Sequence, residues 1–216
     1  PPPPPHTPPP PTPNPTSRCS SAASDVYKRQ EFQSQLLERW LSTDKVINQF
    51  LVHYETGEPI PASLVEKIKN ASTFNQGFGT TEYLASALMD MKLHLADPSD
   101  IDIDKFERET LDELGMPKEL PMRHRTPHFG HVFSGEGYAT AYYGYMWADV
   151  LTSDASEAFK EAPGGFYDKD VADKLVKYLF APRNAMDPAD AYRKFRGRDA
   201  KIEALMRDRG FPGPQG

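Results

Sequence analysis

The chain has 216 residues, a formal net charge of −6 and a single cysteine, Cys19. The acidic balance argues against a general nucleic-acid binder, because contacts to phosphates need a basic surface. No apolar run approaches the length of about 20 residues that spans a bilayer, and one cysteine allows neither a disulfide framework nor a cysteine-based metal site. We therefore expect a cytoplasmic enzyme or interaction domain that binds neither nucleic acid nor a membrane.

The first thirty residues differ from the rest in composition. Half of the 22 prolines lie in the first fifteen residues, and Pro1–Gln30 shows no apolar periodicity, so it cannot build a packed core. One interpretation is a disordered polyproline II tail. We favour another, in which the ending SAASDVYKRQ is translated sequencing-adapter sequence at a broken gene end. The natural protein would then be interrupted just before Glu31, and residues 31–216 would be part of a longer chain.

From Glu31 onward the sequence predicts helices with short connections that proline and glycine mark. Apolar residues recur at helical spacing, and no run alternates as a strand would, so we expect an all-α fold. The expected helical segments are 32–41, 46–51, one from Ser63, one from Thr80 or Thr81 to Ala96, 102–114, 138–162, 169–180, 188–195 and 201–208.

Two of these segments carry more specific signals. Ser63 is followed three residues later by Glu66, which is the pattern of a capping box at a helix start. In the segment that ends at Ala96, an apolar stripe is expected at helical spacing, made of Leu84, Leu88, Met91 and Leu95.

Residues 128–147 read HFGHVFSGEGYATAYYGYMW and concentrate tyrosine. On a helix, Tyr138, Tyr142 and Tyr145 stand at i, i+4 and i+7 and share one face. Neutral phenols are donors that keep their proton at pH 7, and they suit peptide carbonyls or an oxyanion formed from one. The alternative is an aromatic stripe buried against neighbouring helices, and spacing alone slightly favours it.

The remaining residues of this segment are given supporting roles. Gly135 and Gly137 would let the backbone bend and approach a ligand closely. Tyr143 and Trp147 point to another face of the expected helix and are interpreted as packing residues. His131 is interpreted as a donor at the start of the tyrosine helix.

Three histidines cluster just before the tyrosines. His124 and His128 have the i, i+4 spacing of a zinc pair on a helix. Pro127 opposes the helical conformation of the residue before it, and no acid stands beside either histidine as HExxH requires. We therefore do not predict a zinc site among His124, His128 and His131.

The segment RTPHFGHVFSGEGYATAYYGYMW resembles the substrate-binding segment of the thimet oligopeptidase family of zinc metallopeptidases, which includes oligopeptidase A and the peptidyl-dipeptidases. Three further stretches agree in order and spacing. EFQSQLLERW (Glu31–Trp40) is similar to the family's EFPSQ segment, ASTFNQGFGTTEYLASALMDMKLH (Ala71–His94) to its FNQGF region, and DPADAYRKFRGRDAKIEALMRDRGF (Asp187–Phe211) to its C-terminal end. The spacing from His131 to Tyr138 favours the bacterial branch.

The resemblance implies an all-α, neurolysin-like, two-lobed peptidase whose deep channel admits short peptides. It implies zinc, held by both histidines of HExxH and by a glutamate that matches Glu31. HExxH is absent here, and its place in the family would fall before Glu31, so 31–216 is expected to be the C-terminal part of the metallopeptidase catalytic domain. Gln33 replaces the family's usual proline.

The resemblance also assigns roles within the tyrosine segment. Tyr145 and His131 are the expected catalytic residues: Tyr145 would meet the oxyanion, and His131 would contact the substrate backbone beside Tyr138 and Tyr142. Gly135 and Gly137 belong to the same substrate-binding set. The complete enzyme is expected to be monomeric, and endopeptidase action is not separated from removal of C-terminal dipeptides.

Two other functions are weighed against this one. A non-enzymatic helical interaction module could use the tyrosine-rich face to bind a partner, and a nucleic-acid-stacking protein is disfavoured by the acidic charge. By itself the chain is expected to bind zinc poorly and to cleave nothing, because Glu31 is the only metal ligand that the resemblance assigns to it.

Overall fold

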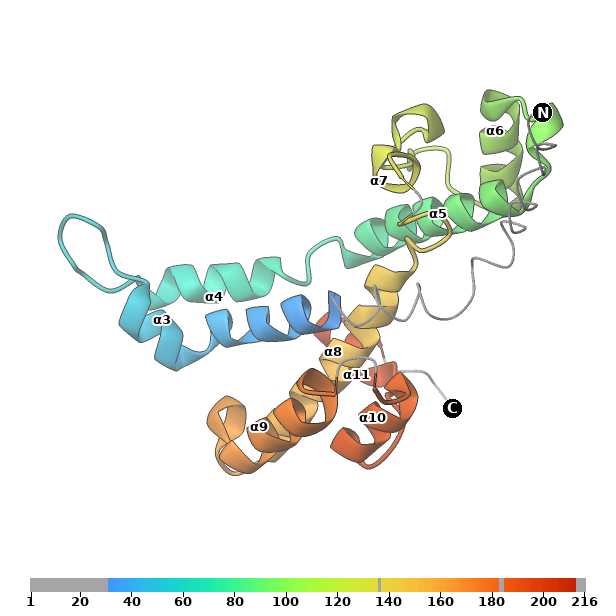
Figure 1. The fold of residues 1–216 in the computed structure, drawn as a ribbon. Coiled ribbons are helices and arrows are strands. Elements are labelled where there is room, and N and C mark those ends of the chain that lie inside the picture. Colours follow the sequence, from blue (N-terminus) through green and yellow to red (C-terminus); the bar gives the residue numbers. More distant parts are fainter. Residues whose placement is uncertain (1–30, 136, 183–184, 213–216) are drawn as a thin grey trace, which may run out of the picture.

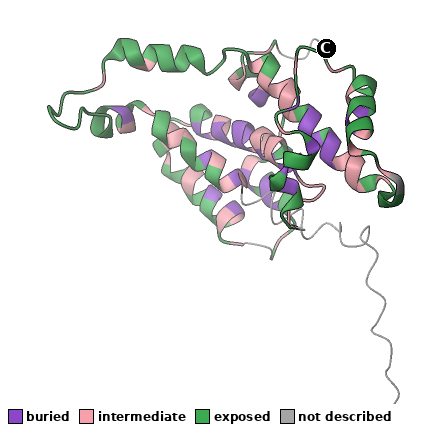
Figure 2. Cartoon of the chain, turned by 90° about the horizontal axis from the view of Figure 1, so that it is seen from above, coloured by how far each residue is buried: buried purple, intermediate pink, exposed green. Residues whose placement is uncertain are grey.

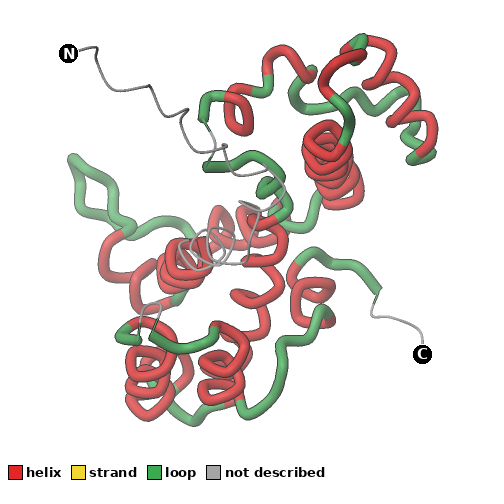
Figure 3. The backbone as a smooth tube through the Cα atoms, turned by 45° about the vertical axis from the view of Figure 1, so that its right-hand side comes forward, coloured by secondary structure: helices red, strands yellow, loops and turns green. Residues whose placement is uncertain are grey.

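The computed structural model describes residues 31–135, 137–182 and 185–212. These residues form helices joined by loops, with one isolated antiparallel bridge between Val52 and Pro59 and no strand (Figure 3). The prediction of an all-α fold is thus confirmed. Within the described ranges, no helix has the length and apolar character needed to cross a membrane. The expectations for Pro1–Gln30 lie outside the described residues.

Residues 31–38 are α-helical and continue into a 3-10 turn, Arg39–Ser42 (η1). The α-helices that follow are α3 (Asp44–Phe50), α4 (Ala62–Ala71), α5 (Gln76–Leu95), α6 (Ile103–Glu113), α7 (Gly130–Phe133), α8 (Gly144–Glu161), α9 (Lys169–Leu175), α10 (Pro188–Arg196) and α11 (Glu203–Asp208). Shorter elements are the 3-10 turns Pro98–Asp100 (η2), Thr126–His128 (η3) and Gly165–Tyr167 (η4), and a π-helical segment, Val176–Phe180 (η5), that extends α9.

Local chemistry sets several helix ends. Asp102, Asp168 and Asp187 each precede a helix and accept a backbone N–H of its first turn, which satisfies donors that otherwise lack a partner. The capping box predicted at Ser63 does not form. Helix α4 begins one residue earlier, after Pro61, so Ser63 already lies inside its first turn and no side chain caps the helix.

Helix α8 is the central element of the lower half of the molecule in Figure 1. Helix 31–38, α9 and α10 pack on it around one buried cluster, and α11 lies against it as well. The members of this cluster are Phe32, Leu36, Ala148, Ala155, Phe159, Leu175, Leu179, Ala191, Tyr192 and Phe195. By contrast, α3 and α4 form an arm that extends away from it, and α4 buries none of its residues (Figures 1 and 2).

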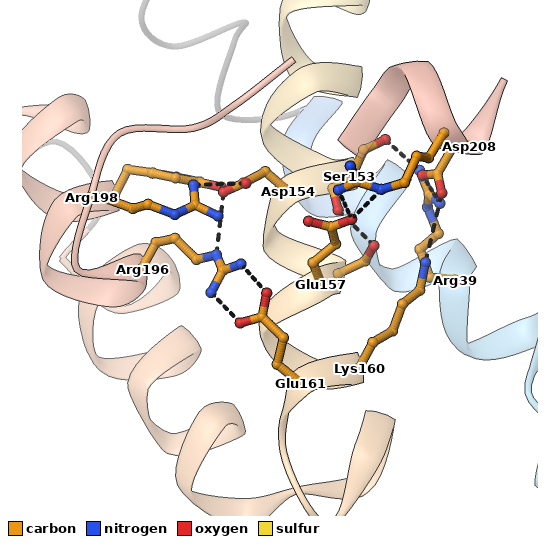
Figure 4. Close-up of polar contacts among 12 residues, drawn as sticks. Arg39, Ser153, Asp154, Glu157, Lys160, Glu161, Arg196, Arg198 and Asp208 are labelled. Atoms are coloured by element: carbon orange, nitrogen blue, oxygen red, sulfur yellow. Dashed lines mark hydrogen bonds and ion pairs between the residues drawn. The ribbon is translucent and has the colours of Figure 1, made fainter. Parts of the chain in front are cut away.

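Ion pairs fix the last two helices onto α8 (Figure 4). Asp154, fully buried on α8, lies 3.3 Å from Nε of Arg196 and 2.8 Å from a guanidinium nitrogen of Arg198. Arg196 also binds both carboxylate oxygens of Glu161, at 2.7 and 2.6 Å. On the other side of α8, a second group joins it to α11 and to η1: Arg39, Ser153, Glu157, Lys160, Arg207 and Asp208.

Helix α5 begins at Gln76, four or five residues before the predicted start at Thr80 or Thr81. The predicted apolar stripe is largely exposed: Leu84 and Leu88 are each 41% exposed and Leu95 is 71% exposed. The residues of α5 that are buried in the described chain are Met89 and four small or polar residues, Ala85, Ser86, Ala87 and Asp90. Small side chains let a neighbouring loop come close, and polar ones bind its backbone, which leucine cannot do.

The helix predicted from Tyr138 is wrong at its start. Residues 138–143 form turns, and α8 begins only at Gly144. Thr140 has a φ of 61°, in the left-handed region, which interrupts a right-handed helix. The side chain of Asp90 on α5 accepts the backbone N–H groups of Thr140 and Tyr142 and so holds this turn in place. The i, i+4, i+7 geometry expected of the tyrosines therefore does not exist.

Candidate functional site

The predicted residues nevertheless meet in space. We use the name tyrosine cluster for His131, Tyr138, Tyr142 and Tyr145. The ring centre of His131 lies 4.5 Å from that of Tyr138, 5.4 Å from Tyr142 and 5.5 Å from Tyr145. The rings of Tyr138 and Tyr145 are stacked with centres 6.2 Å apart. A loop, α7 and the start of α8 thus bring together what a single helix face was expected to carry.

A hydrogen bond joins the two expected catalytic residues. The Tyr145 hydroxyl lies 3.0 Å from Nε2 of His131, which is exposed on the short helix α7. The phenol has one proton, whereas its oxygen can also accept. When His131 carries its proton on Nε2, it donates to the Tyr145 oxygen and leaves the phenolic O–H for another acceptor.

Tyr145 is held in its neutral form. Burial raises the pKa of the Tyr145 phenol, and the neighbouring Tyr138 hydroxyl and the Glu31 carboxylate raise it further, because a phenolate there would be poorly solvated and repelled by a negative charge. Tyr145 is therefore a donor throughout the physiological range. The same interaction shows that Glu31 lies beside Tyr145, although the two are far apart in the sequence.

The contact between helix 31–38 and the start of α8 has a specific cause. The Gln35 side-chain amide, one turn after Glu31, donates to the backbone carbonyl of Tyr145 at 3.3 Å. Its carbonyl oxygen accepts from the Thr152 hydroxyl at 3.4 Å. This bridge fixes the helix that carries Glu31 against the helix that carries Tyr145.

Tyr142 is placed differently from Tyr138 and Tyr145. Tyr142 is only 7% exposed, and its ring centre lies 4.8 Å from that of Phe129 and 5.1 Å from that of Tyr83. Burial raises the pKa of the Tyr142 phenol, and the positive charge of Arg123 offsets part of this effect. Tyr142 is thus packed against Phe129 and Tyr83, and the substrate contact expected of it from the sequence stays a prediction.

Gly135 and Trp147 also depart from expectation. Gly135 is exposed but does not adopt a positive φ, and the sharp turn lies at Thr140 instead. Gly137 is partly exposed in the same loop. Tyr143 packs against the buried cluster that contains Phe129 and Tyr142, as expected, and also lines an open cavity of about 900 Å³. Trp147, also expected to be a packing residue, lines the same cavity and is 53% exposed.

Helix α5 supplies residues that sequence reasoning did not assign to the site. The Tyr83 hydroxyl donates to the carbonyl of Tyr142 and accepts the backbone N–H of Met146 at 3.2 Å, so it caps the first turn of α8. Two turns later, Asp90 binds the loop that carries Tyr138. Tyr83 and Asp90 are seven residues apart and share one helix face with Ala87. The spacing of Tyr83 and Asp90, two polar residues about 100° around the helix from the leucines, was a signal available in the sequence.

The ionisation of these two α5 residues reflects their burial. Desolvation raises the pKa of the Tyr83 phenol, which therefore remains a donor. Burial likewise raises the pKa of Asp90, although the backbone N–H groups of Tyr142 and Thr140 and the nearby His94 act in the opposite direction.

The part of the chain that the structure describes does not form a complete zinc site. Among its residues, no group of three or more histidine, cysteine, aspartate or glutamate side chains could hold a metal ion. His124 stacks on Phe129 with ring centres 5.1 Å apart, and His94 pairs with Asp90. Glu31, the ligand that the family resemblance implies, has no second and third ligand beside it in this part of the chain.

Comparison with known proteins finds related peptidases. The model of peptidase family M3 matches residues 24–211. The dipeptidyl carboxypeptidase of Salmonella typhimurium is 34% identical over 185 residues, which are 84% of this chain and 27% of that protein. Oligopeptidase A of Escherichia coli is 32% identical over 205 residues, 92% of this chain and 29% of its own length.

An organellar oligopeptidase A of Arabidopsis thaliana is 33% identical over 190 residues, 84% of this chain and 23% of its own length. The chain therefore spans less than a third of the length of these relatives. The family match begins at Ser24, inside the segment expected to be an adapter remnant, and that expectation stays a prediction. Because the match covers most of the sequence and keeps the segments that form the tyrosine cluster, the chain belongs to peptidase family M3.

Proposed function

We propose that this chain supplies the peptide-binding and carbonyl-polarising part of a family M3 peptidase that hydrolyses short oligopeptides, either as an oligopeptidase or as a dipeptidyl carboxypeptidase. The observation that carries the proposal is the meeting of Tyr138, Tyr145 and His131 beside Glu31. These side chains come from separate segments, and each segment is held by its own hydrogen bonds. The two activities are those of the matched relatives.

In this proposal Tyr145 donates a hydrogen bond to the oxygen of the peptide carbonyl, where negative charge develops during hydrolysis. Its raised pKa keeps the proton on the phenol, so Tyr145 can donate a hydrogen bond at neutral pH. A donor of this kind is worth on the order of 10²–10³ in kcat. Tyr138 stacks on Tyr145 and fixes its orientation, while His131 holds the phenolic oxygen and presents its exposed edge to the peptide backbone.

Zinc dependence and the metal ligand Glu31 belong to the proposal. When bound in such enzymes, zinc activates water and polarises the carbonyl. The described residues do not complete a zinc site, and the 216-residue sequence contains no HExxH. We therefore assign Glu31 as one ligand of a site that other residues would have to complete, and derive no catalytic step through it.

The proposal also includes location, oligomeric state and architecture. We propose a cytoplasmic monomer, supported by a match to a probable cytosolic oligopeptidase A of Arabidopsis thaliana. We further propose that these helices line one side of a channel between two lobes. The exposed Leu84 and Leu88 on α5 support this part, because an exposed leucine row fits a second lobe packed against it.

Peptide binding tests the central claim without requiring turnover. The 216-residue chain is titrated with a fluorescent octapeptide, and Tyr145→Phe is compared with Tyr54→Phe, which removes a hydroxyl from an exposed tyrosine outside the tyrosine cluster. We expect Tyr145→Phe to weaken binding by about threefold to tenfold, the value of one hydrogen bond. Tyr54→Phe should leave the affinity unchanged. Equal effects of the two substitutions would contradict the proposal.

Metal binding and turnover are measured on the same chain. After addition of equimolar zinc and desalting, we expect no stoichiometric metal and no cleavage of a quenched fluorogenic oligopeptide, because one carboxylate does not hold zinc against water. Stoichiometric zinc with chelator-sensitive cleavage would show that the assignment of the metal site is wrong. Binding of a folded protein partner but of no short peptide would favour the alternative, a non-enzymatic interaction module.

A further inference from the structure

Both carboxylate oxygens of Asp90 accept hydrogen bonds from the backbone of one loop. Oδ1 accepts the N–H of Thr140 at 3.0 Å, and Oδ2 accepts the N–H of Tyr142 at 3.1 Å. The residue is 1% exposed, so water does not compete for these bonds. A buried carboxylate is costly unless its oxygens are bound, and here two peptide groups from a segment about fifty residues away bind it.

The loop adopts a conformation that needs such support. Thr140 is β-branched and has a φ of 61°, a region that non-glycine residues rarely occupy and that costs of order 1–3 kcal/mol. The turn separates Tyr138 from Tyr142 and lets the ring of Tyr138 stack on Tyr145 rather than follow a helical path. The bonds from Asp90 thus stabilise the turn on which the relative positions of the phenols depend.

His94 contacts both Asp90 and α7. Its Nδ1 lies 2.9 Å from the Asp90 carbonyl and 2.9 Å from Oδ1 of Asp90, both acceptors, so Nδ1 carries a proton. Its ring stacks on Phe133 with centres 5.4 Å apart, and Phe133 lies on α7, the helix that carries His131. Asp90 and His94 therefore hold the tyrosine loop and α7 from one helix.

We propose that Asp90, oriented by His94, is a positioning residue that sets the loop of Tyr138 and Tyr142 for peptide binding. The expected effect on peptide affinity rests on the proposed function. The placement of the loop itself can be measured separately.

The test compares two isosteric substitutions in the 216-residue chain. Asp90→Asn keeps one acceptor oxygen and turns an NH₂ group toward a backbone N–H, so one of the two loop bonds is lost. Asp154→Asn is the matched control, because Asp154 is equally buried on a helix and paired with cationic side chains. Asp154 belongs to the cluster around α8 and α10 and makes no bond to residues 138–142.

Two readouts are used. The first is the set of tyrosine ring resonances after selective ¹³C labelling, which reports how Tyr138, Tyr142 and Tyr145 pack on one another. The second is the affinity for the fluorescent octapeptide. We expect Asp90→Asn to shift the ring resonances of the tyrosine cluster and to weaken peptide binding about tenfold, the value of one hydrogen bond to a charged group. Asp154→Asn should change neither while lowering stability.

A second variant covers the case in which Asp90→Asn does not fold. His94→Phe keeps a flat ring against Phe133 but removes the bond to Asp90, and it should shift the resonances of Tyr138 and Tyr142 in the same way by a smaller amount. A folded Asp90→Asn or His94→Phe chain with unchanged ring resonances would overturn the inference, as would equal effects of Asp90→Asn and Asp154→Asn on both readouts. If the wild-type chain binds no peptide, the proposed function fails, and the ring resonances alone decide whether Asp90 positions the loop.

Discussion

Replacement of Asp154 by asparagine probes what fixes the C-terminal helices to α8. Asp154 is 0% exposed and accepts the Tyr192 hydroxyl at 2.7 Å on one oxygen, which also lies 3.3 Å from Nε of Arg196. Its other oxygen lies 2.8 Å from Arg198 but in a direction that does not make a hydrogen bond. We therefore treat Arg198 as an ion-pair partner only.

The expected loss of stability depends on which contacts Arg196 and Arg198 retain after the substitution. Removal of one member of a buried ion pair costs about 3–5 kcal/mol when its partner is left without compensation. Arg196 retains Glu161, with bonds of 2.7 and 2.6 Å, and Arg198 is exposed enough to turn toward water. The cost of Asp154→Asn should thus fall at the lower end, about 3 kcal/mol.

Urea unfolding followed by circular dichroism measures this loss. With a slope of about 2 kcal/mol per molar urea, the midpoint should fall by roughly 1.5 M. Tyr192→Phe removes the hydroxyl that bonds to Asp154 and should cost about 1.5 kcal/mol. The double variant should lose less than the sum of the two, because the residues share one bond. A loss below about 1 kcal/mol for Asp154→Asn, at unchanged slope, would refute this account.

Three further predictions concern other parts of the structure. Tyr83→Phe removes the hydroxyl that caps α8 and should cost about 1–3 kcal/mol in urea unfolding, because the N–H of Met146 loses its partly buried acceptor. A smaller loss would mean that water replaces the hydroxyl. The backbone N–H groups of Val171 and Gly164 lower the pKa of Asp168 below its ordinary value of 3.8. Its contribution to the free energy of unfolding is therefore present above pH 3.8 and is lost as the pH falls through the lower pKa of the folded state. Asp168→Asn should reduce this acid-dependent loss of stability, and an unchanged dependence of stability on pH would contradict the assignment. Leu88→Gln should change stability by less than about 0.5 kcal/mol, since this leucine is exposed, and a loss of 2 kcal/mol or more would place it in a core.

The helical character and most helix positions could be predicted from the sequence, because both depend on local pattern. Apolar spacing located α6, α10 and α11 to within two residues at each end, and it located α9 together with its π-helical extension η5. The aspartate caps before α6 and α10 stand where a helix start requires them. The residues of the candidate site could also be selected, since His131, Tyr138, Tyr142 and Tyr145 lie in one short segment whose composition is unusual for a core. These properties belong to residues close together in the sequence.

Tertiary structure decided how that segment folds and which side chains support it. Local propensity favours a helix through Tyr138, but the buried carboxylate of Asp90, some fifty residues earlier, binds two peptide groups and stabilises the left-handed turn at Thr140. The same long-range contacts made the polar face of α5 the packed one and left Leu84 and Leu88 exposed. Periodicity identifies a face of a helix but not its partner, because the partner's free energy of packing depends on residues that are distant in the sequence and near only once the chain has folded.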